Sequence, residues 1–357
     1  MSKLKKLDRN AFSRGDLPKG CKLCSQGGKL VLFVTGICNM SCYYCPISEK
    51  KKDNDVIYAD EMPIKKDNDI LYEAKCIGAL GTGITGGEPL LNLKRTLHYI
   101  NLLKKKFGEK HHIHLYTTRG YKNEILALKK AGLDEIRFHV VPSLWENFEN
   151  SKIYKRILFA LKSSMSVGIE IPLMPKMEKQ LTHMILKADA LGVDFINLNE
   201  LEIPNFQVME KKKFRYKDSY SLSIKGSEEL AKKLSKLNTK MTIHYCSAAF
   251  KDGVQLGKRL IRRAKRTAKE YEVITKEGLL ILGIIRGINK KELKKIYDFL
   301  RKNYDIPKNL IEINFERKRI ETAAWLLEEI AKELPFECWE VEEYPTWDRL
   351  QIESEKL

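Results

Sequence analysis

Residues 38–45 read Cys38-Asn39-Met40-Ser41-Cys42-Tyr43-Tyr44-Cys45, three cysteines in a C-x3-C-x2-C spacing. The run before them, residues 29–35, is apolar and partly β-branched, which predicts a buried strand. Three thiolates on one short loop can bind three irons of a [4Fe–4S] cluster and leave the fourth iron open. The spacing alone leaves two alternatives, three buried cysteines or a zinc loop that takes a fourth ligand from elsewhere.

A second motif, Gly86-Gly87-Glu88-Pro89, follows a short strand predicted at 83–85. With this motif, the cysteine spacing and the aromatic Tyr44 before the last cysteine, the chain resembles the radical S-adenosylmethionine (radical SAM) superfamily. Within it, the chain is similar to archaeal proteins related to pyruvate formate-lyase activating enzyme. The resemblance covers about residues 29–250.

This resemblance implies a [4Fe–4S] cluster held by Cys38, Cys42 and Cys45, with S-adenosylmethionine on the open iron. The glycine motif would bind the methionine end: Gly86 and Gly87 allow close backbone approach, and Glu88 takes the ammonium. An electron donor such as a ferredoxin or flavodoxin would drive cleavage to methionine and a 5′-deoxyadenosyl radical, which abstracts hydrogen from a substrate.

The resemblance also indicates further cofactor contacts. Tyr44 belongs to the cysteine motif, and Thr117 and Asn197 end later strands, where family members bind ribose and adenine through polar side chains. A solvated strand end is the alternative for Thr117 and Asn197. Three histidines, His111, His112 and His114, begin a predicted strand away from those ends, and we expect them at an edge or on the surface.

Strand and helix patterns alternate from residue 29 to about 250, which predicts an α/β fold with a parallel sheet. Six or seven such units fit the partial (β/α)6 barrel of the radical SAM family, with its chemistry at the carboxyl ends of the strands. Residues 1–28 form a basic N-terminal arm with a C-x2-C pair. Residues 251–357 predict a C-terminal α+β domain of ββαβαβ order, whose second helix spans 320–333.

The arm's Cys21 and Cys24 are spaced like half of a metal site. His244 and Cys246 end the last predicted barrel strand and point the same way. The four side chains would make a Cys3His set for zinc or a second iron–sulfur cluster. The alternative is that the cysteine pair has other partners or no metal. Cys76 and Cys338 are predicted to be structural.

The net charge of +18 is unevenly distributed. Residues 321–357 hold 11 acids against three bases, and the preceding 320 residues therefore carry +26. Such an excess is typical of proteins that bind polyanions, although a lysine-rich surface is an alternative. A predicted helix from Gln255 to Tyr271 places Leu256, Leu260, Ala264 and Ala268 on one face and cations on the others.

Two basic segments predict an RNA interface, with transfer RNA favoured. Its candidate residues are Arg259, Arg262, Arg263 and Arg266 on that helix and Lys213, Phe214 and Tyr216 in a loop. A solvated helix and a lid loop are the alternative. A peptide-modifying enzyme or glycyl-radical activase is the second hypothesis for function, with the acidic end as a docking surface. A non-catalytic, metal-containing RNA-binding protein is the third.

No apolar run approaches the ~18 residues needed to span a membrane. The basic N-terminus has no apolar signal region behind it, and we therefore expect a cytoplasmic protein. The sequence leaves open the outcome of the radical reaction, the substrate, the identity of a second metal, the electron donor and the oligomeric state.

Overall fold

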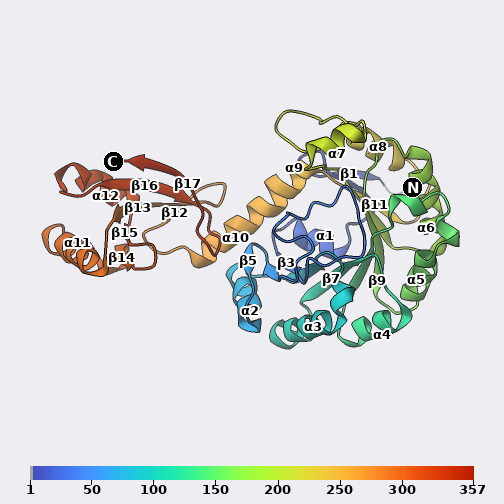
Figure 1. The fold of residues 1–357 in the computed structure, drawn as a ribbon, viewed down its shortest axis with the longest axis horizontal. Helices are drawn as coiled ribbons and strands as arrows, with labels where there is room; N and C mark the ends of the chain where they lie inside the picture. Colours follow the sequence, from blue (N-terminus) through green and yellow to red (C-terminus); the bar gives the residue numbers. More distant parts are fainter. Residues whose placement is uncertain (1–2) are drawn as a thin grey trace. The chain divides into compact units, whose positions relative to one another are not determined.

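Seven parallel strands form most of one sheet (Figure 1). The cysteine motif lies in the loop that follows the first of these strands along the chain. The computed structural model describes residues 3–357. In order across the sheet these strands are β11 (Thr242–Cys246), β10 (Phe195–Asn199), β9 (Ser166–Pro172), β8 (Glu135–Phe138), β7 (His112–Thr117), β6 (Gly81–Thr85) and β3 (Lys29–Phe33). Their outward side chains, such as Leu30, Leu115 and Ile169, are fully buried.

Helices follow six of these strands along the chain and cover the outside of the sheet (Figure 1). They are α2 (Asp67–Cys76), α3 (Leu93–Phe107), α4 (Lys122–Lys130), α5 (Lys152–Leu161), α6 (Glu178–Leu191) and α8 (Ser227–Leu234). Each returns the chain to the start of the next parallel strand. Six βα units and a seventh strand therefore make the partial barrel that the sequence predicts.

The described chain divides into two compact units. One runs to Lys75 and from Ala79 to Leu256, and the other comprises Cys76–Gly78 and Gly257–Leu357. The first unit includes the residues that the sequence assigns to an N-terminal arm. There β1 (Leu4–Lys6) and β2 (Phe12–Arg14) continue the sheet antiparallel beyond β11, and β4 (Tyr58–Ala59) and β5 (Met62–Pro63) extend it beyond β3.

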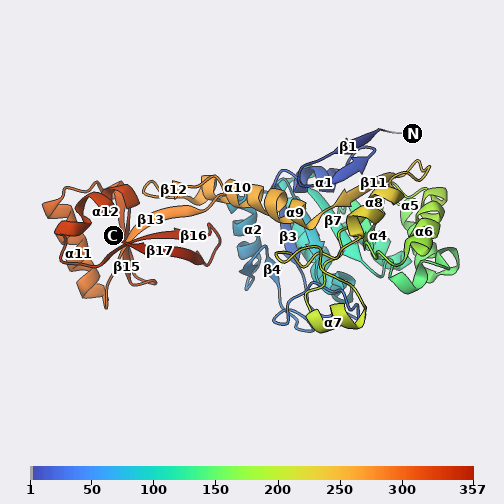
Figure 2. The same cartoon turned by 90° about the horizontal axis from the view of Figure 1, so that it is seen from above.

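Helix α1 (Lys19–Cys24) lies inside the curve of the sheet, as Figure 1 shows, with β1 and α1 on the face away from α7 in Figure 2. At Gly20 a Cβ atom would lie 2.5–2.9 Å from the side chains of Arg137, His114 and Glu135. Only glycine fits there, so α1 packs directly on the polar side chains within the barrel.

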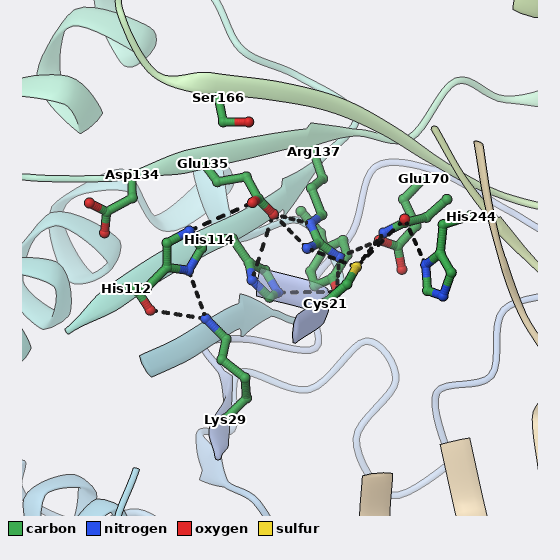
Figure 3. Close-up of polar contacts among 12 residues, drawn as sticks. Cys21, Lys29, His112, His114, Asp134, Glu135, Arg137, Ser166, Glu170 and His244 are labelled. Atoms are coloured by element: carbon green, nitrogen blue, oxygen red, sulfur yellow. Dashed lines mark hydrogen bonds and ion pairs between the residues drawn. The ribbon is translucent and has the colours of Figure 1, made fainter. Parts of the chain in front are cut away.

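The interior of the barrel beside α1 is charged. Lys29 Nζ donates to the carbonyl oxygens of Thr82 and His112 at 2.9 Å each. Arg137 pairs with Glu135 at 2.5 Å and with Glu170 at 2.7 Å (Figure 3). These pairs satisfy the buried charges, which would otherwise cost several kcal/mol each.

The expectation that the three histidines lie at the surface is wrong. His111, His112 and His114 are 3–4% exposed, because strand alternation turns His112 and His114 inward and α1 covers them. Burial lowers the pKa of His111 to about 4 and that of His112 to about 3, and lowers that of His114 as well.

The second unit contains a mixed α+β arrangement with an antiparallel sheet. Its strands are β12 (Val273–Ile274), β13 (Leu280–Arg286), β14 (Ile311–Asn314), β15 (Arg319–Thr322), β16 (Cys338–Glu343) and β17 (Gln351–Lys356). The order is β14-β15-β13-β16-β17, with β12 on β13. Its helices are α10 (Gly257–Thr267), α11 (Lys290–Asn303) and α12 (Ala324–Ile330).

This order differs from the predicted ββαβαβ in two places. Residues 319–322, assigned in part to a helix, form β15, because Ile320 and Thr322 pair with β13 and β14 and are buried. The missed β17 is exposed along its whole length and highly polar, so it carries no periodic apolar signal. Tertiary pairing overrides local pattern in both cases.

Smaller elements complete the first unit. Helix α7 (Phe206–Lys211) lies in the long segment after β10, and α9 (Ala248–Phe250) follows β11. The predicted long basic helix begins instead with a π-helical turn, Lys251–Leu256, before α10. In the described residues no helix is both long and apolar enough to cross a membrane.

We predict that the free energy of unfolding falls as the pH drops from 6.5 to 4. The unfolded histidines bind protons near pH 6.5, whereas His111 and His112 stay neutral in the fold until about pH 4 and 3. His111 alone should cost about 3 kcal/mol by pH 4. Chemical denaturation of the cluster-free protein measures this. Replacing both His111 and His112 by Gln should make the free energy of unfolding less dependent on pH. A free energy of unfolding that stays constant from pH 6.5 to 4 in the parent chain would contradict the prediction.

Candidate active site

The cysteine loop leaves the carboxyl end of β3 and exposes its three sulfurs in part. Cys38, Cys42 and Cys45 are each partly buried, and none is in a disulfide. The amide of Met40 donates to Cys38 Sγ at 3.4 Å, and that of Cys45 to the Cys42 carbonyl at 3.1 Å. Burial raises the pKa of the Cys38 and Cys42 thiols, and iron would take the place of their protons.

The glycine motif lies backbone to backbone against the start of this loop. Gly87 N donates to Thr35 O at 2.7 Å, and Glu88 N to Ile37 O at 2.9 Å. A Cβ atom on Gly86 would lie 2.5 Å from Thr35 O, and one on Gly87 2.4 Å from Ile37 O. No larger residue fits at either position, so the two glycines let the ends of β3 and β6 join.

Glu88 is fully buried and accepts four hydrogen bonds. Its oxygens accept hydrogen bonds from the hydroxyls of Thr117 and Thr118 at 2.8 and 2.7 Å. They also accept from the amides of Thr118 and Leu90 at 2.7 and 3.0 Å. These donors fill the four lone-pair sites of a carboxylate. An incoming ammonium would have to share oxygens that already hold the glycine loop to the end of β7.

Tyr44, in the cysteine motif, is held from a neighbouring strand end. Its hydroxyl lies 3.0 Å from His139 Nε2, and His139 Nδ1 lies 3.1 Å from the Glu170 carbonyl oxygen. A carbonyl only accepts, so Nδ1 carries the proton and Nε2 accepts from Tyr44. Burial lowers the pKa of His139, which keeps this neutral form. The motif predicts Tyr44 but gives no sign of this support.

Asp55 is a second support that the sequence does not reveal. It accepts from the Thr35 hydroxyl at 2.8 Å and binds Arg95 through both oxygens at 2.6 and 2.9 Å. Arg95 also donates to the Val34 carbonyl at 3.0 Å. The segment after the cysteines is thereby fixed to the end of β3 and the start of α3. No motif marks these residues, because they meet only in the fold.

Thr117 and Asn197 have other partners than the cofactor contacts expected for them. The Thr117 hydroxyl donates to Glu88 and accepts from the Arg119 amide at 2.8 Å. Asn197 is 2% exposed, and its amide contacts Cys21, Glu170 and His244. Both side chains are buried and hydrogen-bonded inside the fold, and the cofactor contacts expected for them stay predictions.

The four residues of the predicted second metal site come from α1 and β11. Asn197 lies between Cys21 and His244, and the Gln255 amide lies between Cys24 and Cys246. Within residues 3–357, no three His, Cys, Asp or Glu side chains stand close enough to hold one metal ion. The same applies to the cysteine loop, whose ligands would bind different irons of one cluster.

The arginines predicted to face RNA are largely engaged in packing. Arg263 is 5% exposed and donates to the Pro345 carbonyl, and Arg262 donates to the carbonyls of Ile77 and Gly78. The Arg266 guanidinium lies against Gly78, and Arg259 has further partners. The prediction of an outward row of cations is therefore corrected for Arg262 and Arg263, because carbonyls of the same unit need them as donors.

In the basic loop, Lys213 is exposed, whereas Phe214 and Tyr216 are half-buried. Lys176 Nζ donates to the carbonyls of residues 212 and 213 and lies 5.1 Å from the Phe214 ring centre. The Tyr216 hydroxyl donates to the Ile203 carbonyl at 2.9 Å. Both rings thus help to shape the loop and do not project as a free stacking surface.

Known protein families and one long relative resemble this chain. The radical SAM superfamily model matches residues 32–140, and a domain of unknown function, DUF8061, matches residues 278–357. A Methanocaldococcus jannaschii protein, named as a candidate glycyl-radical enzyme activating enzyme, is 42% identical over 94% of this chain and 92% of its own length. The chain belongs to the radical SAM superfamily. It is an enzyme of this superfamily, whose cofactors are a [4Fe–4S] cluster and S-adenosylmethionine.

More distant similarities cover about half of this chain. A Sulfolobus acidocaldarius protein named as a candidate GTP 3′,8-cyclase is 25% identical over 47% of this chain and 50% of its own. The structure of Streptococcus suis SuiB bound to the precursor peptide SuiA matches at 15% identity and a TM-score of 0.38, over 51% of this chain and 42% of that chain.

The residues present fit these cofactors. Three partly exposed thiols share one loop, as a cluster with one open iron requires. Beside them, Gly86 and Gly87 let the glycine motif pack directly on the start of the cysteine loop, because a Cβ atom at either position would meet the carbonyl oxygen of Thr35 or Ile37. The expected cluster ligands, Cys38, Cys42 and Cys45, and the glycine contacts with S-adenosylmethionine stay predictions.

We predict that Gly87→Ala lowers S-adenosylmethionine cleavage on the order of a hundredfold, because its methyl group would push the Ile37 carbonyl and the cysteine loop aside. Production of 5′-deoxyadenosine measures this. Gly108→Ala is the control, since an added methyl meets nothing within 4 Å there and costs only about 1 kcal/mol of backbone strain. Equal rates in the two variants would refute the contact.

Cys42→Ala should abolish both the cluster and the cleavage. Anaerobically reconstituted parent protein should bind about four irons at this loop, and two thiolates are too few to hold them. Iron and sulfide analysis with the cleavage assay tests this. Cys76→Ala, on α2, should keep both properties. Cleavage by the Cys42 variant would rule out this assignment.

Proposed function

We propose that this enzyme activates a glycyl-radical enzyme by removing a hydrogen from the Cα of a glycine in a partner protein. The observation that carries the proposal is the 42% identity to a relative with that name, over 94% of this chain. The match extends through the second unit as well as the barrel. When bound and given one electron by a donor such as a ferredoxin or flavodoxin, the cluster and S-adenosylmethionine would yield methionine and a 5′-deoxyadenosyl radical. That radical would take the hydrogen, leaving 5′-deoxyadenosine and a glycyl radical.

The chain's own part is to hold the cofactor loops and to receive the partner. Glu88 and His139 fix the glycine motif and Tyr44. These contacts are internal, so they set the geometry before any substrate arrives. Such preorganisation reduces the ordering needed when the target glycine enters.

The segment 202–225, which follows β10, supports a protein partner. It adjoins the cysteine loop, because Lys212 Nζ lies 4.5 Å from the centre of the Tyr43 ring. Three of its apolar side chains are exposed, Phe206 (55%), Tyr220 (98%) and Leu222 (45%). Exposed apolar and aromatic side chains beside an active site are typical of protein-binding surfaces.

RNA, the partner first expected from the charge, is the competing substrate. The test is whether extract from cells grown on glycine with two deuterons at Cα stimulates cleavage by the purified enzyme. Mass spectrometry of 5′-deoxyadenosine reads out the label. We expect stimulation that protease removes and ribonuclease leaves intact, with deuterium in the product.

Two controls, a matched extract and an enzyme variant, make the outcome decisive. An extract from cells grown on unlabelled glycine should stimulate equally without label, and the Cys42→Ala enzyme should produce nothing. If ribonuclease treatment removes the stimulation, the substrate is RNA and the proposal is wrong. Protease-sensitive stimulation without deuterium would indicate a protein residue other than glycine.

A further inference from the structure

Three thiols and one imidazole gather in the barrel interior, apart from the cysteine loop of the active site. Cys21 and Cys24 come from α1, and His244 and Cys246 come from β11. Cys21, Cys246 and His244 are 7%, 6% and 2% exposed, and Cys24 is partly buried. The proposed activity uses none of these four side chains.

Two amides link the four residues in pairs. Asn197 Nδ2 lies 3.3 Å from Cys21 Sγ, and Asn197 Oδ1 lies 3.1 Å from His244 Nδ1. On the other side, Gln255 Oε1 lies 3.1 Å from Cys24 Sγ, and Gln255 Nε2 lies 3.5 Å from Cys246 Sγ. Residues more than 200 positions apart in the sequence are thus separated by one side chain.

The protonation of His244 follows from this network. Asn197 Nδ2 donates to Glu170 at 2.8 Å, which fixes the amide so that its oxygen faces His244. His244 Nδ1 must therefore carry the proton, and Nε2 keeps its lone pair. In the described part of the chain, Nε2 is buried without a hydrogen-bond partner. Burying a nitrogen without a hydrogen-bond partner is unfavourable, and a nitrogen that keeps its lone pair is the form in which imidazole binds a metal.

A positive side chain also adjoins the sulfurs. Arg137 Nη2 lies 3.5 Å from Cys21 Sγ (Figure 3). Arg137 also pairs with Glu135 and Glu170, so it is held in place. A fixed cation beside a metal-bound thiolate offsets the negative charge of a multi-thiolate site.

We propose that Cys21, Cys24, Cys246 and His244 bind a second metal centre, which fastens α1 to the last strand of the barrel. Three thiolates and one imidazole suit zinc or an iron–sulfur cluster. The sulfurs stand too far apart to hold one ion while the Gln255 amide lies between Cys24 and Cys246. Gln255 is partly exposed, in the π-helical turn, and binding requires its amide to withdraw.

The experiment counts metals in full-length protein purified without oxygen. The Cys38→Ala, Cys42→Ala, Cys45→Ala triple variant removes the active-site cluster, so any remaining metal reports the second centre. We expect it to retain about one zinc or about four irons per chain, and the element found distinguishes the two. Adding Cys21→Ala and Cys24→Ala should remove that metal.

Two further variants keep the result interpretable if the cysteine changes disturb folding. In the triple background, His244→Gln should remove the nitrogen scattering from the X-ray absorption spectrum of the metal, and Gln255→Ala should leave metal content unchanged or raised. Cys76→Ala with Cys338→Ala is the matched control and should retain the metal. A triple variant that holds neither zinc nor iron, or metal that persists without Cys21 and Cys24, would overturn the proposal.

Discussion

The close approach of two backbones at the ends of β3 and β6 determines the geometry of the active site. Gly86 and Gly87 allow hydrogen bonds of 2.7 and 2.9 Å between the glycine motif and residues 35–37. Because parallel pairing aligns these strand ends, the sheet itself sets the distance between the cysteine loop and the glycine loop. Glu88 then links this pair of strand ends to the end of β7 through three hydrogen bonds with Thr117 and Thr118.

A charged interior is unusual for a barrel core, where branched apolar side chains predominate. Here Lys29, Glu135, Arg137 and Glu170 are paired with one another or with backbone carbonyls. Such pairs stabilise little compared with an apolar core, but one missing partner is costly. That asymmetry ties the packing of α1 to the barrel strands, because Gly20 and Cys21 lie on this network.

The sequence predicts the parts of this fold that depend on local pattern. The cysteine spacing, the glycine motif and the repeated strand–helix pattern mark the barrel and its reactive edge, since each is written in contiguous residues. No pattern in the sequence identifies hydrogen-bond partners that come from distant segments. Thr117 ends a strand as predicted, yet its hydroxyl donates to Glu88, and the Asn197 amide contacts Cys21 and His244. Strand alternation would have turned His112 and His114 inward had α1 been placed in the barrel.

The net charge is a poor guide to binding surfaces for a related reason. A count of ionisable residues does not distinguish exposed charges from those that are hydrogen-bonded or ion-paired within the fold. Arg262 and Arg263 donate to carbonyls of the second unit, and Glu321 and Glu343 pair with Arg319 inside it. Neither the basic helix nor the acidic end is therefore a free electrostatic surface throughout. A substrate can contact only the side chains that remain exposed beside the cysteine loop. Those of the segment 202–225 combine lysines with apolar groups, which favours a protein over a polyanion read by charge alone.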